Sequence, residues 1–347
     1  MARVGRRVKR FIVSILGATA FLWAGSGAQA AGSAAFYRGK AVNIIIGYSP
    51  GGGYDAYARL LGRFIGKHIP GNPTILPQNM PGAGSLKATM YIYEIAPKDG
   101  TVFGTVGNTE ALAPLLTPNV AKFDATKLTW IGSITSDVSL CVSWHTSPIK
   151  TWADMLTKTY TVGGTGAGSD PDVYALTVKN IFGAKINLVT PYPGTTDISL
   201  AMQRGEVDGL CGFSWSTIKT QHGDWLPNKD INFLVQQALS KSPELPDVPL
   251  ITEFATNDQQ LQMLKVIMAS QAIYRPFFGP PGIPDDRKQV LRKAFADTMQ
   301  DAGFLAEAKR ARFDVHPIMG DRIEVLLKGI YATPKDIVEK AARATGN

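Results

Sequence analysis

Residues 41–65, AVNIIIGYSPGGGYDAYARLLGRFI, place three consecutive glycines between a short apolar run and an amphipathic pattern. The apolar run, residues 41–48, is rich in β-branched side chains and predicts a buried strand. In residues 55–67 the apolar side chains recur at spacings of three and four, which predicts a helix. Ordered glycine loses more backbone entropy than any other residue. Three glycines at this junction therefore indicate that another group comes close to the main chain.

The alternation of strand and helix patterns continues along the chain. Further strands are predicted at 74–80, 101–107, 160–164, 186–192, 207–213, 231–238 and 313–317, and further helices at 86–96, 151–156, 170–182, 195–204 and 256–270. Repeated βα units predict mostly parallel sheets with helices on their faces. The chain of 347 residues is long enough for two such domains.

Two long extended passages, near residues 130–144 and 272–280, are the places where the chain is expected to cross between domains. The first domain would then be discontinuous and contain residues 31–136 and 276–347. The second domain would contain the middle of the chain, residues 137–275.

The first thirty residues are predicted to be a secretory signal peptide. Basic side chains at positions 6, 7, 9 and 10 precede an apolar stretch, residues 11–24, and a small-residue site, AQA, at 28–30. Cleavage is expected before Ala31. An apolar stretch of this length is too short to span a membrane, and so we expect the chain to be exported.

Most of the chain's net positive charge belongs to this leader. The formal net charge is +8 for the whole chain and +3 without residues 1–30, which hold five basic residues and no acidic one. No block of lysine and arginine interleaved with aromatic residues remains, and so nucleic acid is not an expected partner. No other apolar run approaches the roughly 18 residues that a membrane helix needs.

The two cysteines, Cys141 and Cys211, both lie in strand-like runs. An exported compartment permits a disulfide. If the two strands are neighbours, a bridge would close a 70-residue loop and contribute about 4 kcal/mol in the chain-entropy model. Two buried free thiols are the alternative interpretation.

Glycine-rich loops follow several of the predicted strands. They are SPGGGYD (49–55), MPGAGS (80–85), GGTGAGSD (163–170) and PGTTD (193–197). Each leaves free N–H groups at a helix N-terminus, which favour an anion. In parallel α/β sheets such loops gather at the carboxyl ends of the strands, where ligands bind. Any one loop can be a tight turn without a ligand, but together they predict an anion-binding cleft between the domains.

The sequence lacks the motifs of most nucleotide-binding and catalytic sites. A P-loop is absent, and residues 164–169 depart from the dinucleotide fingerprint at the last position. The run GFSWS (212–216) ends in serine where a nucleophile elbow has glycine. The four histidines are scattered, and no Cys/His cluster has the spacing of a metal site. We therefore expect no catalysis, no cofactor and no metal.

Several side chains beside these loops have more than one interpretation. Asp55 can cap the helix that follows the glycines, receive a ligand amine, or hold waters that bridge to a ligand carboxylate. Tyr54, Tyr192 and Trp215 flank the loops. They can form the wall of the cleft against an apolar ligand body, or belong to the core.

A set of motifs runs in order along nearly all of the chain after the leader: IIIGYSPGGGYDAYARLLGRFI, MPGAGSLKAT, APKDGTVFG, SPIKTWADML, GGTGAGSD, PYPGTTDISLAMQRGEVDG, LPDVPLITEF and FFGPPGIPDD. Together they resemble the Bug family, the TctC-type receptors of tripartite tricarboxylate transporters (TTT). The resemblance implies a periplasmic binding protein-like (type II) Venus flytrap, with two doubly wound α/β lobes joined by crossover strands. It also implies a periplasmic location and no catalysis.

The resemblance further implies which residues hold the ligand. In this family a ligand carboxylate is typically held by backbone N–H groups, hydroxyls and waters from loops of both lobes. Carried over to this sequence, the contacts would come from Ser49, Gly52, Gly53, Tyr54, Asp55, Asn108 and Thr109 in the first lobe and from Thr165, Gly166, Ser169, Pro193 and Gly194 in the second. Ser49, Tyr54 and the run 212–215 differ from the residues commoner in the family, which leaves the identity of the carboxylate open.

Three functions follow from these observations. The first is a monomeric periplasmic receptor that captures a small organic carboxylate and delivers it to the membrane permease subunits of a TTT system. The second is an exported sensor that presents its ligand to a signalling system. The third is an exported hydrolase, which the missing nucleophile–base pair and metal cluster argue against.

Overall fold

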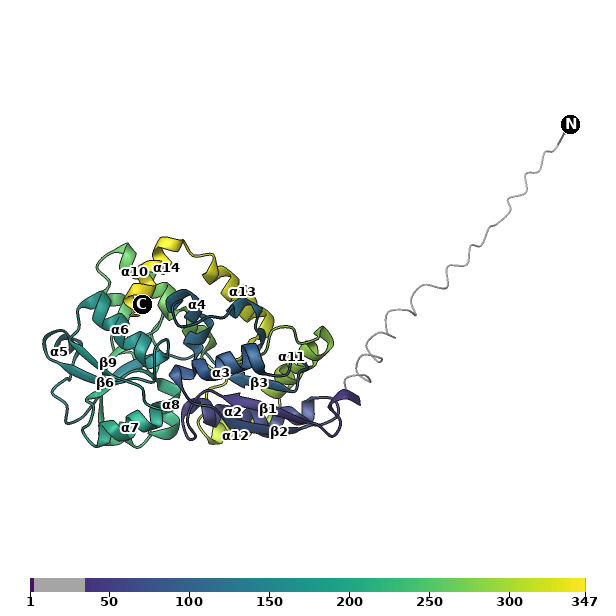
Figure 1. Ribbon diagram of the computed structural model, residues 1–347, viewed down its shortest axis with the longest axis horizontal. Coiled ribbons are helices and arrows are strands. Elements are labelled where there is room, and N and C mark those ends of the chain that lie inside the picture. Colours follow the sequence, from purple (N-terminus) through teal and green to yellow (C-terminus); the bar gives the residue numbers. More distant parts are fainter. Residues whose placement is uncertain (3–34, 347) are drawn as a thin grey trace.

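Two separate β-sheets organise the chain into two lobes (Figure 1). The computed structural model describes residues 1–2 and 35–346, and the predicted signal peptide therefore lies outside the described residues apart from its first two positions. Helices alternate with the strands in both lobes. The two-lobed α/β architecture predicted from this alternation is confirmed.

The first lobe is built on a six-stranded sheet with the order β11-β4-β10-β3-β1-β2. Strand β1 pairs in parallel with β2 and β3, whereas β10 runs antiparallel to β3 and β4. The strands are β1 (Ala41–Ile46), β2 (Thr74–Asn79), β3 (Val102–Thr105), β4 (Thr129–Ser133), β10 (Pro276–Gly279) and β11 (Ile318–Met319). The helices are α2 (Gly53–Ile65), α3 (Leu86–Met90), α4 (Ala113–Leu116), α11 (Asp285–Met299), α12 (Ala302–Arg310) and α13 (Gly320–Tyr331).

The second lobe is built on a five-stranded sheet with the order β7-β6-β8-β5-β9. Strand β6 pairs in parallel with β7 and β8, and β5 runs antiparallel to β8 and β9. The strands are β5 (Ser139–Trp144), β6 (Tyr160–Gly163), β7 (Ile186–Val189), β8 (Gly209–Ser214) and β9 (Ile231–Gln237). The helices are α5 (Trp152–Thr157), α6 (Asp170–Phe182), α7 (Thr195–Gln203), α8 (Trp215–Gln221), α9 (Trp225–Asn228) and α10 (Asp258–Met268).

Strand β1, which leads into the three glycines, is buried on both faces. Val42, Ile44 and Ile46 pack in one apolar cluster with Leu61 of α2, and Ile45 points into a second cluster on the opposite face. Full burial of such a side chain contributes about 1.5–3 kcal/mol. The continuous apolar run of this strand follows from its place inside a sheet that is covered on both sides.

Two local predictions are wrong, and one helix was missed. The strand expected at 313–317 lies later, as β11, because Ile318 and Met319 are the residues that pair with β4. Helix α8 was not expected after β8, although Ser214 caps it by accepting a hydrogen bond from the amide of Thr217. The extended passage 272–280 contains a strand only at β10, because residues 269–273 form a 3₁₀ turn.

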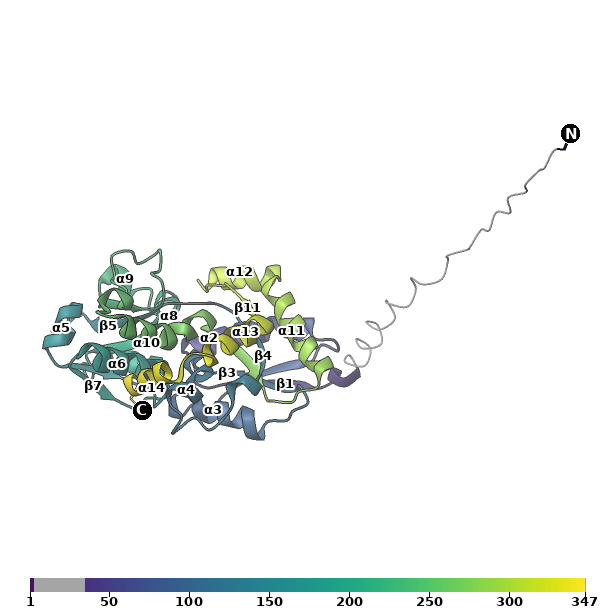
Figure 2. The same cartoon turned by 90° about the horizontal axis from the view of Figure 1, so that it is seen from above.

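The chain passes between the sheets in two connecting segments and once more near its end. Residues 134–138 lead from β4 to β5, and residues 269–275 lead from α10 to β10. The last helix, α14 (Lys335–Ala344), follows α13 and packs against α10 and α6 of the second lobe as well as α4 (Figures 1 and 2). Ile337 and Ala341 of α14 share an apolar cluster with Leu264 of α10.

Cys141 of β5 and Cys211 of β8 form a disulfide. The two strands are antiparallel neighbours in the five-stranded sheet, and both cysteines are fully buried. The bridge closes a loop of 70 residues that contains β6, α6, β7 and α7. It therefore restricts the unfolded chain over most of the second lobe.

Replacement of both cysteines, C141S with C211S, is expected to lower the free energy of unfolding by about 2–4 kcal/mol, because the unfolded chain regains the entropy that the bridge removes. Urea titration of the wild type and the variant measures the difference. A reducing agent should shift the midpoint of the wild type and leave that of the variant unchanged. A wild-type midpoint that does not respond to reduction under unfolding conditions would contradict the stabilising role of the bridge.

Candidate functional site

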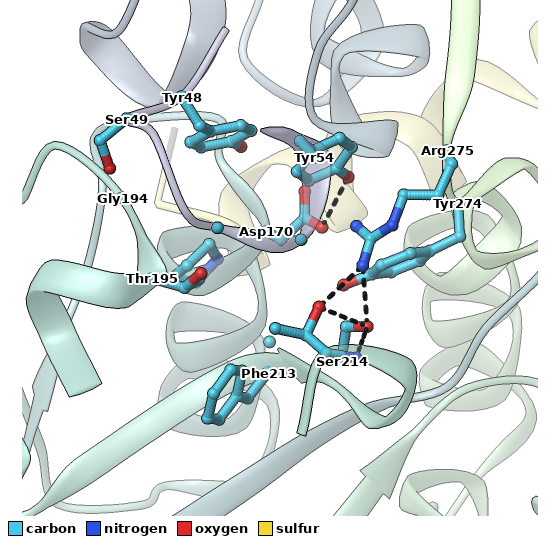
Figure 3. A pocket seen from close by; sticks show the side chains of 15 residues that line it. Tyr48, Ser49, Tyr54, Asp170, Gly194, Thr195, Phe213, Ser214, Tyr274 and Arg275 are labelled. Carbon is cyan, nitrogen blue, oxygen red and sulfur yellow. Dashed lines mark hydrogen bonds between the residues drawn. The ribbon is translucent and has the colours of Figure 1, made fainter. Parts of the chain in front are cut away.

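A cavity lies between the two lobes, where the loop after β1 meets the carboxyl ends of the second sheet (Figure 3). Its volume is about 20 Å³, which suits a water molecule. A ligand of several heavy atoms therefore enters only if the lobes separate or the lining side chains move. The lining residues are Tyr48, Ser49, Gly52, Gly53, Tyr54, Asp170, Pro171, Gly194, Thr195, Gly212, Phe213, Ser214, Thr217, Tyr274 and Arg275.

Gly53, the last of the three glycines after β1, has a steric reason to be glycine. A Cβ atom at Gly53 would clash with Thr217 Oγ1 and would lie 2.7 Å from Arg275 Nη2. Real Cβ atoms do not approach other heavy atoms so closely, and so only glycine lets the second lobe pack on the start of α2. The close approach predicted from the sequence is therefore an approach by α8 and Arg275.

The N-termini of α2 and α7 face each other across the cavity. A Cβ atom placed on Gly52 would lie 3.7 Å from Thr195 Oγ1, and Ser49 Oγ donates a 3.0 Å hydrogen bond to Asp197 Oδ2 in the first turn of α7. The first turn of a helix has N–H groups without intrahelical partners, and the helix dipole adds partial positive charge there. One helix from each lobe thus presents its positive end to the same space.

Arg275, which sequence analysis did not single out, is the one cationic side chain among the residues that line the cavity. Its side chain is only 1% exposed. Nη2 donates hydrogen bonds of 3.0 Å to Ser214 Oγ and 2.8 Å to Thr217 Oγ1. The guanidinium carbon lies 4.5 Å from the ring centroids of both Tyr54 and Tyr274, in the range of cation–π attraction.

Part of the guanidinium remains available for a further partner. The Nε atom of Arg275 is buried and has no hydrogen-bond partner among the described residues. A buried donor without a partner has a desolvation cost of about 1–3 kcal/mol or more when charged. An anionic ligand in the cavity would remove this cost.

Two buried carboxyl groups accompany Arg275. Asp170, the first residue of α6, accepts hydrogen bonds from Thr109 Oγ1 at 2.9 Å and from Tyr54 OH at 3.4 Å. Burial raises the pKa of the Asp170 carboxyl, although the Thr109 hydrogen bond and the charge of Arg275 oppose the shift. Asp137 accepts hydrogen bonds from the hydroxyls of Ser214 and Ser216, and burial likewise raises the pKa of its carboxyl.

In the second-lobe loop 163–170, two main-chain amides form hydrogen bonds within the same lobe. Asp172 Oδ1 accepts hydrogen bonds from the amides of Thr165 and Gly166 and from the hydroxyl of Ser169. The carbonyl of Thr165 accepts a 2.8 Å hydrogen bond from the amide of Gly84 in the first lobe. These three residues therefore support the contact between the lobes and do not line the cavity.

The structure brings five of the predicted ligand residues to the cavity wall: Ser49, Gly52, Gly53, Tyr54 and Gly194. The others lie behind it. Asp55 lies in the first turn of α2, whose N-cap is Gly52, and so it does not cap this helix. It accepts hydrogen bonds from the amide of Gly51 and from the side chains of Arg59 and Asn79. The amide of Asn108 donates a hydrogen bond to Tyr54 OH, and the hydroxyl of Thr109 donates one to Asp170. Pro193 precedes the lining residue Gly194.

Direct contacts across the lobes extend to the far side of α8. Lys219 of α8 forms ion pairs with Glu244 of its own lobe at 2.8 Å and with Asp314 of the first lobe at 3.0 Å. Asp314 is also bound through its amide, which donates to Tyr57 OH at 3.0 Å. The structure therefore has the two lobes in direct contact around the cavity.

Two other properties of the described residues bear on function. Within residues 1–2 and 35–346, no group of three or more histidine, cysteine, aspartate or glutamate side chains is arranged to hold a metal ion. None of the helices in the same part of the chain is long and apolar enough to cross a membrane.

Two α/β lobes that meet at a cavity, with the N-termini of α2 and α7 at its wall, define a bilobal solute-binding protein. A family model described as the tripartite tricarboxylate transporter family receptor (TctC) matches residues 63–340. The chain belongs to this family of periplasmic solute-binding receptors. No curated protein sequence matches the chain.

Solved structures share this fold at low sequence identity. The periplasmic binding protein BugD is 18% identical, with a TM-score of 0.71, and the match covers 88% of this chain and 98% of BugD. MatC of Rhodopseudomonas palustris, solved with bound malate, is 20% identical, with a TM-score of 0.68 and coverage of 86% and 99%. Rpa4515 of R. palustris, solved with adipate, is 18% identical, with a TM-score of 0.68 and coverage of 89% and 98%.

The substitution Gly53→Val is expected to prevent the lobes from closing, because its side chain would occupy the space of Thr217 Oγ1 and Arg275 Nη2. Small-angle X-ray scattering should show a larger radius of gyration than for the wild type. Gly329→Ala in α13 is the control, because a Cβ atom there meets no other atom within 4 Å. Equal radii for the Gly53 variant and the control would contradict the assigned close approach.

Proposed function

We propose that this protein is a periplasmic receptor that captures a small organic carboxylate between its lobes and delivers it to a TTT-type membrane permease. The observation that carries the proposal is the convergence of three positive groups on one cavity. These groups are the N-terminus of α2, the N-terminus of α7 and the guanidinium of Arg275. The family of the chain and the malate and adipate bound by MatC and Rpa4515 support a carboxylate as the ligand.

The proposed contacts combine main-chain and side-chain donors. Ser49, Gly52, Gly53, Tyr54 and Gly194 line the cavity and would meet the ligand directly. The remaining predicted residues, which are Asp55, Asn108, Thr109, Thr165, Gly166, Ser169 and Pro193, would hold these contacts in place. Arg275 adds a charged fork whose geometry matches a carboxylate.

Closure of the lobes would couple binding to delivery. The proposed moving bodies are residues 31–136 with 276–347 and residues 137–275, which hinge at the two crossings. A ligand that contacts both lobes binds the closed form better and shifts the population toward it. The ion pair between Lys219 and Asp314 adds a contact that is present only when the lobes meet.

The remaining parts of the proposal concern location and partners. A cleavable leader, residues 1–30, would export the chain to the periplasm. The closed receptor would act as a monomer and dock on the transmembrane permease subunits. It would carry out no catalysis.

A panel of small carboxylic acids tests the proposal on the purified protein. At least one acid is expected to raise the melting temperature, because a ligand that binds only the folded state stabilises it by mass action. Isothermal titration calorimetry then gives its dissociation constant. If no acid of the panel binds at millimolar concentration, the proposed function is wrong.

Arg275→Lys is expected to weaken binding of the best acid by about tenfold or more, because lysine cannot form the two-pronged contact. Arg322→Lys on the exposed face of α13 is the matched control and should bind as the wild type does. Circular dichroism checks that both variants are folded. Unchanged affinity in the folded Arg275 variant would remove this residue from the binding site.

A further inference from the structure

The first turn of α8 receives the guanidinium of Arg275 on three hydroxyl groups (Figure 3). The Nη2 atom lies 2.8 Å from Thr217 Oγ1, 3.0 Å from Ser214 Oγ and 3.5 Å from Ser216 Oγ. All four side chains are buried. The main chain of Arg275 is fixed to Ser133 at the end of β4, and so this contact joins the first lobe to a helix of the second.

The start of a helix is by itself an unfavourable partner for a cation. The N–H groups of the first turn have no intrahelical acceptor, and they carry partial positive charge. A serine hydroxyl has one proton and two acceptor lone pairs. It therefore attracts a guanidinium only when its own proton points elsewhere. The contact between Arg275 and α8 thus requires an acceptor on the other side of the hydroxyls.

Asp137 supplies this acceptor. The hydroxyls of Ser214 and Ser216 each donate a 2.5 Å hydrogen bond to Asp137 Oδ2. The amide of Ser216 donates to the same oxygen at 3.2 Å, and the amide of Val138 donates to Oδ1 at 2.8 Å. Each of these partners is a donor, which suits an ionised carboxylate. Because the serine protons point to Asp137, the serine oxygens present lone pairs to Arg275.

Asp137 and Ser216 lie outside the wall of the ligand cavity. Neither is among the residues that line it, all of which are described. Asp137 instead lines a separate groove of about 410 Å³, together with Trp215, Gln271 and Asp314. Asp137 can therefore influence a solute in the cavity only through the groups that stand between them.

Asp137 also belongs to the hinge. It lies in the crossing segment 134–138, and Arg275 ends the other crossing segment, 269–275. The amide of Asp137 donates a 3.2 Å hydrogen bond to the carbonyl of Gln271, which connects the two segments. The path from Asp137 through the α8 hydroxyls to Arg275 thus links both crossings to the cavity wall.

We propose that Asp137 is a positioning residue, which holds the Ser214 and Ser216 hydroxyls in the orientation that accepts Arg275 and thereby sets the affinity of the receptor for its ligand. Arg275 then keeps the rest of its guanidinium for the solute. This inference rests on the proposed function, because Asp137 acts on the ligand through Arg275. Asparagine cannot replace this carboxylate, since its NH₂ group would face either the two hydroxyl protons or the amide of Val138.

Calorimetry with the acid of the panel that binds the wild type most tightly tests the inference. Asp137→Asn is expected to weaken binding about tenfold, because a charge-assisted network that holds Arg275 is lost. Ser216→Ala is expected to weaken it about threefold, because it removes a single hydroxyl of that network. Asp321→Asn, at an exposed position of α13, is the matched control and should bind as the wild type does. Circular dichroism checks that each variant is folded.

A double-mutant cycle separates positioning from a merely structural role. If Asp137 acts through Arg275, the variant with both Asp137→Asn and Arg275→Lys should bind within about threefold of Arg275→Lys alone, because residues in one network are not additive. Two independent effects of about tenfold each would instead multiply to about a hundredfold. If Asp137→Asn does not fold, Ser216→Ala, alone and combined with Arg275→Lys, provides the same comparison.

The possible failures are distinguishable. If the wild type binds an acid and folded Asp137→Asn binds it equally well, the positioning role is overturned and the receptor function stands. The same holds if the two substitutions multiply in the double variant, or if Ser216→Ala, as the substitute, leaves the affinity unchanged. If no acid binds the wild type, the proposed receptor function is overturned together with the inference.

Discussion

A buried guanidinium connects the parts of this protein on which its function depends. Arg275 ends the segment that leads from the second lobe to the first, and its amide is fixed by Ser133 Oγ at the end of β4. Its side chain reaches the start of α8 and lies against the ring of Tyr54 in α2. A charge buried in this way needs partners. The hydroxyl groups of α8 supply some of them, and a bound anion would supply the rest.

The glycine-rich junctions serve two different purposes, although their sequences look alike. In the loop 163–170 the side chain of Asp172 binds two main-chain amides, and the loop becomes a rigid surface for contact with the other lobe. At Gly53 the missing side chain lets α8 and Arg275 approach the start of α2. The residues at the starts of α2 and α7 are the ones that line the cavity.

The sequence predicts the fold better than the cavity. Periodicity locates β1, α2 and α6 within two residues, because burial of their apolar faces dictates the pattern. The resemblance to the Bug family predicts five residues of the cavity wall. Arg275 and Asp170 were missed because each is a single polar residue outside any recognisable motif. Their presence at one cavity depends on how the two lobes pack. The place of α14 on the second lobe likewise depends on contacts far apart in the sequence.

The last helix gives the receptor a means of adjustment that lies away from its cavity. Because α14 follows α13 of the first lobe and packs on α10 and α6 of the second, separating the lobes strains or slides this apolar contact. The resting balance between open and shut forms therefore depends on its fit. Affinity can then drift during evolution through residues such as Ile337, while every group that touches the solute stays the same.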